Sequence, residues 1–116
     1  MSVIGFLMDD LTEKARLHWD ALPGAGYINF SYDFPVIREI VPGATEQRLI
    51  DSGGDLSLTP QVIETAKKLE AQGVKAISTG CGFYAMFQQE VARAVSVPVV
   101  LSSLLQVPLV SQIIGK

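Results

Sequence analysis

The feature that most constrains the fold is the regular alternation of helix and strand patterns over the second half of the chain. Apolar side chains recur at helical spacing in three segments, and short continuous apolar runs of strand length separate them. Thr59-Pro60 suit the start of the first helix and Gly73 suits its end. The expected helices are 59–72, 83–95 and 107–114, and the expected strands between them are 74–78 and 97–101.

Two further apolar runs, 3–8 and 36–41, have the length of buried strands and precede this alternation. Strands that alternate with helices are joined by right-handed crossovers and form a parallel sheet. A chain of 116 residues suits a single hydrophobic core. We therefore expect one α/β domain over residues 1–116, built in three layers, with a mostly parallel four-stranded sheet and flanking helices.

The amino-acid composition argues against several classes of partner. Hydrophobic residues make up 48% of the chain and charged residues 18%, which favours a folded core over disorder. The net charge of −3, with nine scattered basic residues, argues against nucleic acid. Residues 94–115 carry no charge, but prolines and polar side chains interrupt them, so no membrane span is expected. The single cysteine cannot form an internal disulfide, which favours a reducing compartment such as the cytoplasm.

Polar or small residues follow three of the expected strands. In an open parallel sheet, ligands bind outside the carboxyl ends of the strands, which all meet at one edge. Asp9 follows the first strand, residues 79–82 follow the third, and Ser102 and Ser103 follow the fourth. Asn29 lies on a loop rich in glycine and aromatic residues that could fold over this edge. The pattern predicts a ligand site there without naming a reaction.

Cys81 is the most informative residue of this site. It stands between Gly80 and Gly82, directly before the helix expected from Phe83. Unpaired N–H groups at a helix start favour a thiolate and also a bound carboxylate, and the two glycines let a ligand approach the main chain. The alternative is a small buried side chain with no chemical role, which is common for a free cysteine. The residues alone leave both interpretations open.

The other candidates have equally plain structural interpretations. Ser102 and Ser103 could cap the last helix, Asp9 could simply end a strand, and the loop of Asn29 could pack as a small aromatic core. His18 fits a surface helix. One histidine and one cysteine far apart give no metal-binding set, so no metal is expected, and the chain has no glycine-rich phosphate-binding motif.

One long segment resembles a known family. The run "GVKAISTGCGFYAMFQQEVARAVSVPVVLSSLLQVPLV", residues 73–110, is similar to the N-terminal half of the aspartate/glutamate racemase superfamily. Its loop with Cys-Gly-Phe, followed by Phe-Gln and "SSLLQVPL", looks most like an uncharacterised racemase-like branch. The run "DFPVIREIVPGAT", residues 33–45, fits the same branch. Together these segments cover roughly two-thirds of the chain.

The resemblance implies two similar α/β domains with a ligand between them and no cofactor. In the racemases each domain supplies one cysteine, and one thiolate removes the α-proton while the other thiol returns a proton to the opposite face. Cys81 matches the first of these cysteines. The resemblance therefore implies that Cys81 is the catalytic acid/base, with Thr79, Gly80, Gly82, Phe83, Ser102 and Ser103 around the ligand.

Two departures from the family pattern stand out. The racemase loop is Cys-Asn-Thr, whereas this chain has Cys81-Gly82-Phe83 and lacks the side-chain amide and hydroxyl. The second domain and its cysteine are also absent from this sequence. Decarboxylase chemistry with one cysteine is a weaker implication, because in those relatives the working cysteine lies in the second domain.

We therefore expect a cofactor-independent racemase or isomerase-like protein that abstracts a proton next to a carboxylate, incomplete as a single domain. Its ligand would be a small carboxylate or an amino-acid-like molecule. Its partner would be a second copy of the chain or a missing second domain. The alternative is a non-catalytic domain, with a structural Cys81, that binds small carboxylates or forms oligomers.

Overall fold

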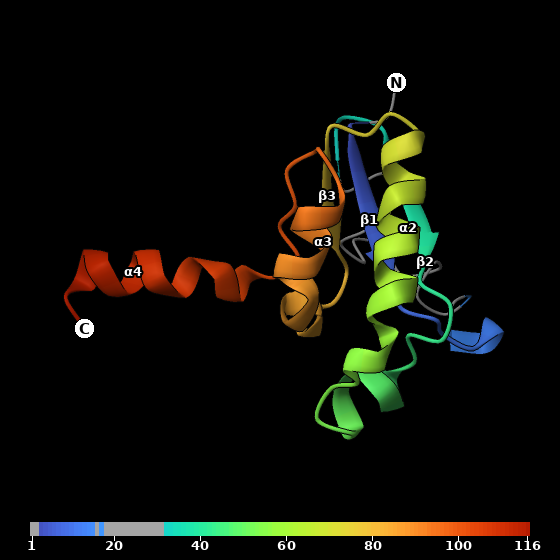
Figure 1. Cartoon of the computed structure of the whole chain (residues 1–116), viewed down its shortest axis with the longest axis horizontal. Coiled ribbons are helices and arrows are strands. Elements are labelled where there is room, and N and C mark those ends of the chain that lie inside the picture. Colours follow the sequence, from blue (N-terminus) through green and yellow to red (C-terminus); the bar gives the residue numbers. More distant parts are fainter. Residues whose placement is uncertain (1–2, 16, 18–31) are drawn as a thin grey trace.

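A parallel three-stranded sheet forms the centre of the protein (Figure 1). The structure is a computed structural model, and it describes residues 3–15, 17 and 32–116. The strands are β1 (Ile4–Met8), β2 (Val36–Ile40) and β3 (Ala76–Thr79), in the order β2-β1-β3. In register, Ile4 of β1 lies opposite Val36 on one side and Ala76 on the other. The α/β class and the parallel sheet predicted from the sequence are confirmed.

Helix α2 (Thr59–Ala71) covers one face of the sheet with the apolar stripe that the sequence predicted (Figure 1). Its buried side chains include Val62, Ala66 and Leu69, which recur every three or four residues. Gly5 in β1 allows close packing, because a Cβ added there would lie 3.1 Å from Leu69 Cδ2. Gly73 has φ +86°, a left-handed conformation that suits glycine and ends the helix.

The opposite face of β1 carries aromatic side chains. The ring of Phe6 lies 5.6 Å from that of Tyr32, and the ring of Tyr32 lies 5.4 Å from that of Phe34. Helices α2 and α3 contact each other. Among the described residues this second face has aromatic rings rather than a helix against it, so the third layer stays a prediction.

The expected fourth strand, 97–101, is not formed as a strand. One parallel bridge joins Ile77 to Val99, and beyond it side chains replace the strand ladder. The Gln88 amide donates to the Val99 carbonyl at 2.8 Å and accepts from the Leu101 N–H at 2.9 Å. Ser78 Oγ donates to the Val100 carbonyl at 2.9 Å. These bonds satisfy the backbone of the segment without a second strand pairing, which is why the described sheet has three strands.

The prediction of a single α-helix over 83–95 is also wrong for the first half of that range. A 3₁₀ helix, η4 (Gly82–Phe87), precedes the α-helix α3 (Gln88–Ala94). A 3₁₀ helix repeats every three residues, so Tyr84 and Phe87 share a face. Both are fully buried, with ring centroids 5.9 Å apart. Phe83 falls on the other side and is 50% exposed.

The last helix begins and ends where the sequence predicted. α4 spans Val107–Ile114 and ends at Gly115, whose φ is +70°. A short 3₁₀ helix, η5 (Ser103–Gln106), leads into it, and the pair projects away from the sheet and its covering helices (Figure 1). Two further short helical turns are η2 (Gln47–Asp51) and η3 (Leu56–Leu58). No helix in the described part of the chain has the length and apolar character needed to cross a membrane.

Candidate functional site

An open pocket of about 350 Å³ lies where β3 ends beside the segment 100–103. Its position at the carboxyl end of a parallel strand is the one expected for a ligand site. Six of the predicted site residues line it: Thr79, Gly80, Cys81, Gly82, Ser102 and Ser103. The other lining residues are Ser78, Val100, Leu101 and Gln106. The structure therefore brings the two polar segments together, although they are about twenty residues apart in sequence.

Thr79 fixes the loop that carries the cysteine. Its hydroxyl lies 2.8 Å from the Cys81 carbonyl and 3.0 Å from the Leu101 carbonyl, and it accepts the Cys81 N–H at 3.2 Å. A hydroxyl has one proton and can donate to only one of these carbonyls at a time. Because main-chain groups occupy this hydroxyl, Thr79 acts chiefly as a clamp between the Cys81 loop and the neighbouring segment.

Ser102 and Ser103 have different roles. Ser102 is buried, and its Oγ accepts the Leu104 N–H at 3.1 Å, so it caps η5. The expected cap of the last helix is not formed, because the N-cap of α4 is Gln106, which makes no side-chain cap hydrogen bond. A Cβ added at Gly82 would lie 3.5 Å from this Oγ, an ordinary contact, so the space beside Ser102 does not itself require glycine. Ser103 is exposed and lines the pocket.

Asp9 interacts with Cys81 but does not line the pocket. Burial raises the pKa of the Asp9 carboxyl, and interactions with the Tyr84 and Cys81 side chains offset part of this rise. Burial, and next the Asp9 charge, also raise the pKa of Tyr84, so its hydroxyl keeps its proton. Asp9 Oδ1 and the Tyr84 hydroxyl are both buried, and neither forms a hydrogen bond of ordinary geometry. Two buried polar groups without full partners thus stand beside the only thiol.

The pKa of the Cys81 thiol is raised, opposite to the lowered value that a helix start predicted. Burial is the largest cause, and the Asp9 charge adds to it, while the Phe83 N–H lowers the pKa. The following helix is a 3₁₀ helix of six residues, which offers less aligned backbone than the α-helix expected from the sequence. In the free protein near neutral pH, Cys81 is therefore mainly the protonated thiol.

Replacing Asp9 with asparagine is expected to lower the pKa of Cys81, because it removes a negative charge that disfavours the thiolate. The pH profile of Cys81 alkylation by iodoacetamide measures this pKa directly, since only the thiolate reacts. Asp51→Asn, on an exposed residue of η2, is the matched control and should leave the profile unchanged. An unchanged profile in Asp9→Asn would show that the Asp9 charge does not act on the thiol.

The remaining predicted residues lie elsewhere. Asn29 and His18 fall outside the described residues. The half-exposed Phe83 side chain does not line the pocket, although its N–H acts on the thiol. Asp10, the neighbour of Asp9, is structural: its Oδ2 accepts the Gly43 N–H at 2.9 Å and holds the turn after β2.

Two residues of the site were missed from the sequence. Tyr84 was hidden in an apparently helical apolar pattern, although a buried tyrosine needs a partner for its hydroxyl. Gln106 lines the pocket and could have been found as a polar side chain close after Ser102 and Ser103. Within the described ranges, no group of three or more His, Cys, Asp and Glu side chains is placed to hold a metal ion.

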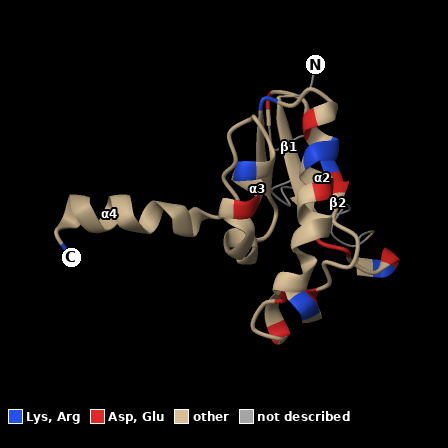
Figure 2. Ribbon diagram, viewed as in Figure 1, with Lys and Arg blue, Asp and Glu red and all other residues tan. Residues whose placement is uncertain are grey.

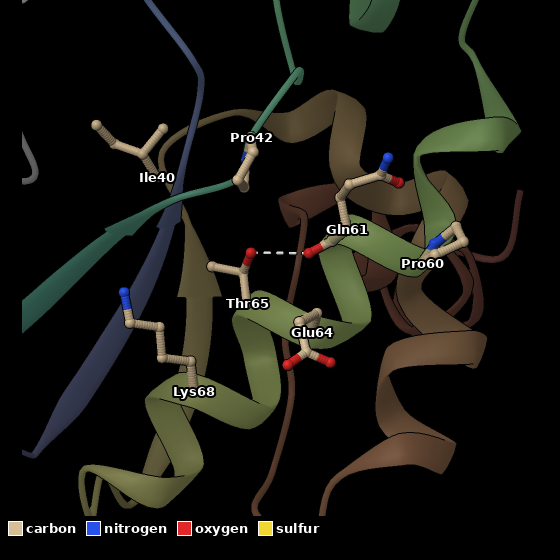
Figure 3. A pocket seen from close by; sticks show the side chains of 7 residues that line it. All are labelled: Ile40, Pro42, Pro60, Gln61, Glu64, Thr65 and Lys68. Carbon is tan, nitrogen blue, oxygen red and sulfur yellow. Dashed lines mark hydrogen bonds between the residues drawn. The ribbon is translucent and has the colours of Figure 1, made fainter.

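A second, larger pocket of about 540 Å³ lies between α2 and the end of β2 (Figure 3). Its walls include Ile40, Pro42, Pro60 and Thr65, whose hydroxyl donates to the Gln61 carbonyl at 2.7 Å. Lys68 at its rim is already paired with Glu39 at 2.8 Å. The nucleophilic side chains of this pocket, Thr65 and Lys68, are both held in these interactions, so the smaller pocket of Cys81 is the better candidate for chemistry.

Comparison with known proteins finds relatives that share one name. No family model matches the chain. It is 33% identical over 103 residues to a dimethylsulfoniopropionate lyase of Durusdinium sp. clade D, covering 84% of this chain and 33% of that protein. It is 34% identical over 97 residues to dimethylsulfoniopropionate lyase 7 of Emiliania huxleyi (strain CCMP1516), covering 82% of this chain and 28% of that protein. The chain thus spans about a third or less of the length of these curated relatives.

These relatives correct the activity expected from the sequence. The proteins that match most of the chain are named as lyases, not as aspartate/glutamate racemases or isomerases, so that expectation is wrong. The departure at Gly82 and Phe83 is consistent with the correction, because the amide and hydroxyl of the racemase loop are absent. Similarity to dimethylsulfoniopropionate lyases is what the comparisons establish.

Proposed function

We propose that the Cys81 pocket belongs to a lyase that cleaves dimethylsulfoniopropionate, or a close sulfonium carboxylate, and that Cys81 is its base. The observation that carries this proposal is the match of 33–34% identity over 82–84% of the chain to proteins named for that activity. The open pocket with a thiol at its centre supports it independently, since a thiolate can abstract a proton next to a carboxylate.

The proposed step is a β-elimination. The Cys81 thiolate takes the proton on the carbon next to the substrate carboxylate. The electron pair of that C–H bond forms the new carbon–carbon double bond, and the adjacent carbon–sulfur bond breaks. Dimethyl sulfide leaves with the electrons of the broken bond as a neutral molecule, and acrylate remains. The thiol then loses its proton to solvent, so the balance needs no oxidant, reductant or second cysteine.

The pocket offers groups for both ends of such a substrate. The Ser103 hydroxyl and the Gln106 amide line it and form no hydrogen bond with other described residues, so they are available to a carboxylate. The Asp9 carboxylate, next to Cys81, would favour the sulfonium charge. A bound cation near the thiol lowers its pKa, which would offset the rise that burial and Asp9 cause.

The proposal also includes what surrounds the pocket and in which compartment it works. An open pocket on one domain exposes the substrate to water, and the relatives are about three times as long as this chain. We therefore place the working site between this domain and a second body, either a further domain or another copy of the chain. A free thiol as the reacting group suits a reducing compartment such as the cytoplasm.

Protection of Cys81 from alkylation tests the proposed ligand. Dimethylsulfoniopropionate is expected to slow the reaction of Cys81 with iodoacetamide in a saturable manner, because the bound molecule covers the thiol. Propanoate, which has the carboxylate but no sulfonium, is the matched control and should protect less. Ser103→Ala should weaken the protection. An alkylation rate that is the same with and without dimethylsulfoniopropionate would contradict the proposal.

A further inference from the structure

The buried Tyr84 side chain has no part in the elimination proposed above. It is 0% exposed and its ring packs on Phe87, so the ring belongs to the core. Its hydroxyl is buried as well and, among the described residues, forms no hydrogen bond of ordinary geometry. A phenylalanine would fill the same space without the cost of burying a polar group. The hydroxyl therefore needs an explanation other than packing.

Asp9 supplies a buried acceptor close to this hydroxyl. Its Oδ1 is also buried without a full partner, and its carboxyl group interacts with the Tyr84 hydroxyl. The backbone brings both residues to the Cys81 loop. The Gly80 N–H donates to the Leu7 carbonyl at 3.3 Å, so the ends of β1 and β3 continue side by side. The Tyr84 N–H donates to the Cys81 carbonyl at 3.2 Å, which holds the first turn of η4 against the loop.

The charged groups that act on this pair are acidic. Burial raises the pKa of the Asp9 carboxyl, and Glu46 raises it further, whereas the contact with Tyr84 is the strongest effect that lowers it. Burial also raises the pKa of Tyr84, and the negative charges of Asp9, Cys81 and Asp10 add to this rise. The Tyr84 hydroxyl therefore keeps its proton and can act only as a neutral donor toward the carboxylate.

No basic side chain is placed to share this task within the described site. None of the residues that line the Cys81 pocket is Lys or Arg. Ser103 and Gln106 of η5 form part of its wall, and η5 and α4 carry no charged side chain before Lys116 at the end of the chain (Figure 2). The negative charge beside the thiol is thus offset by hydrogen-bond donors rather than by a cation.

We propose that Tyr84 is a positioning residue of the Cys81 site, whose hydroxyl donates to the Asp9 carboxylate and so weakens the hold of that carboxylate on the thiol proton. A carboxylate that already accepts the hydroxyl proton is a poorer acceptor for the Cys81 S–H and places less negative charge on the sulfur. The thiolate therefore forms more easily than it would beside Asp9 alone. The inference concerns the acidity of the thiol and stands whether the pocket serves elimination or another reaction.

Tyr84→Phe tests this role, because it removes the hydroxyl and keeps the buried ring. The pH profile of Cys81 alkylation by iodoacetamide is expected to move to higher pH, so that the rate at a fixed pH below the pKa falls by about three- to tenfold. A side chain that served only packing would leave the profile in place. Tyr32→Phe is the matched control: it makes the same change in a ring that packs on Phe6, and the profile should not move.

The same substitution in an Asp9→Asn background separates an action through Asp9 from a direct action on the sulfur. The amide carries no charge for the hydroxyl to offset, so Tyr84→Phe should move the profile much less in this background than in the unmodified chain. An equal movement in both backgrounds would overturn the proposal. So would an unchanged profile or a movement to lower pH in Tyr84→Phe alone, or an equal movement in Tyr32→Phe.

Proton NMR of the unmodified chain gives a second readout that does not depend on the thiol. A buried tyrosine hydroxyl that donates to a carboxylate exchanges slowly with water and gives its own downfield signal. Such a signal is expected in the unmodified chain, absent in Tyr84→Phe and moved upfield in Asp9→Asn, while Asp51→Asn leaves it in place. A spectrum without this signal, or a signal that Asp9→Asn does not move, would exclude the bond between Tyr84 and Asp9.

Discussion

Replacing Cys81 with alanine is expected to reduce the release of dimethyl sulfide from dimethylsulfoniopropionate by about 10²- to 10⁴-fold, the usual contribution of a positioned general base. Cys81→Ser should be nearly as slow, because a hydroxyl of similar size is a far weaker acid and supplies almost no conjugate base. Both variants should retain the fold, since the thiol is only partly buried. Gas chromatography of the headspace measures the rate.

The pH dependence of that rate also tests whether Cys81 is the base. Only the thiolate can act as base, and burial and Asp9 raise the pKa of Cys81. The kcat/KM of the unmodified chain should therefore rise with pH through a value above the ordinary thiol pKa of about 8.5. A rate that falls over that range, or a Cys81→Ala variant as fast as the unmodified chain, would exclude Cys81 as the base.

Phe87→Ala is expected to destabilise the domain by about 3–5 kcal/mol, the usual cost of emptying a buried aromatic site. Phe87 is fully buried and packs edge-on against Tyr84 behind the Cys81 pocket. For a domain whose whole stability is about 5–15 kcal/mol, this loss is severe. Urea denaturation followed by circular dichroism measures the change in the free energy of unfolding.

Phe83→Ala is the matched control for Phe87→Ala. It removes the same side chain from the same 3₁₀ helix, but Phe83 is half exposed, so the loss should be below about 1 kcal/mol. If both variants lost the same stability, the two phenylalanines would share the core as in a continuous α-helix, and the 3₁₀ geometry of η4 would be contradicted.

The elements that were predictable from the sequence are those set by local patterns. The two N-terminal strands follow directly from their apolar runs, which end at Asp9 and at Pro42-Gly43. α4 follows from Pro108 in its first turn and Gly115 at its end. The boundary between η4 and α3 was not predictable, because Phe83, Phe87 and Val91 fit an α-helical spacing as well. The burial of Tyr84 and Phe87 in the core decides the local geometry, and that burial depends on tertiary packing.

The prediction of a fourth strand was wrong for a related reason. The run 97–101 has the composition of a buried strand, but strand pairing depends on what its neighbours offer. The side chain of Gln88 forms hydrogen bonds with the backbone of Val99 and Leu101. No periodicity in the sequence reveals that a side chain from a helix will do so.

Six of the predicted site residues line one pocket because the segments that follow the parallel strand β3 and the run 97–101 meet at one edge, and their role as a site stays a prediction. Its electrostatics were not predictable, since the pKa of Cys81 depends on its burial and on Asp9, which is distant in sequence. The reaction was also beyond the sequence pattern: a thiol beside a carboxylate site serves racemisation and elimination alike. The similarity to proteins named as lyases favours the proposal of elimination.

Proton NMR of dimethylsulfoniopropionate incubated with the chain in D₂O tests the central claim most directly. Elimination at the Cys81 pocket predicts that dimethyl sulfide and acrylate appear in equal amounts as the substrate disappears. Deuterium entering the carbon next to the carboxylate of intact substrate, with no acrylate formed, would show proton abstraction without cleavage. That result would contradict a lyase.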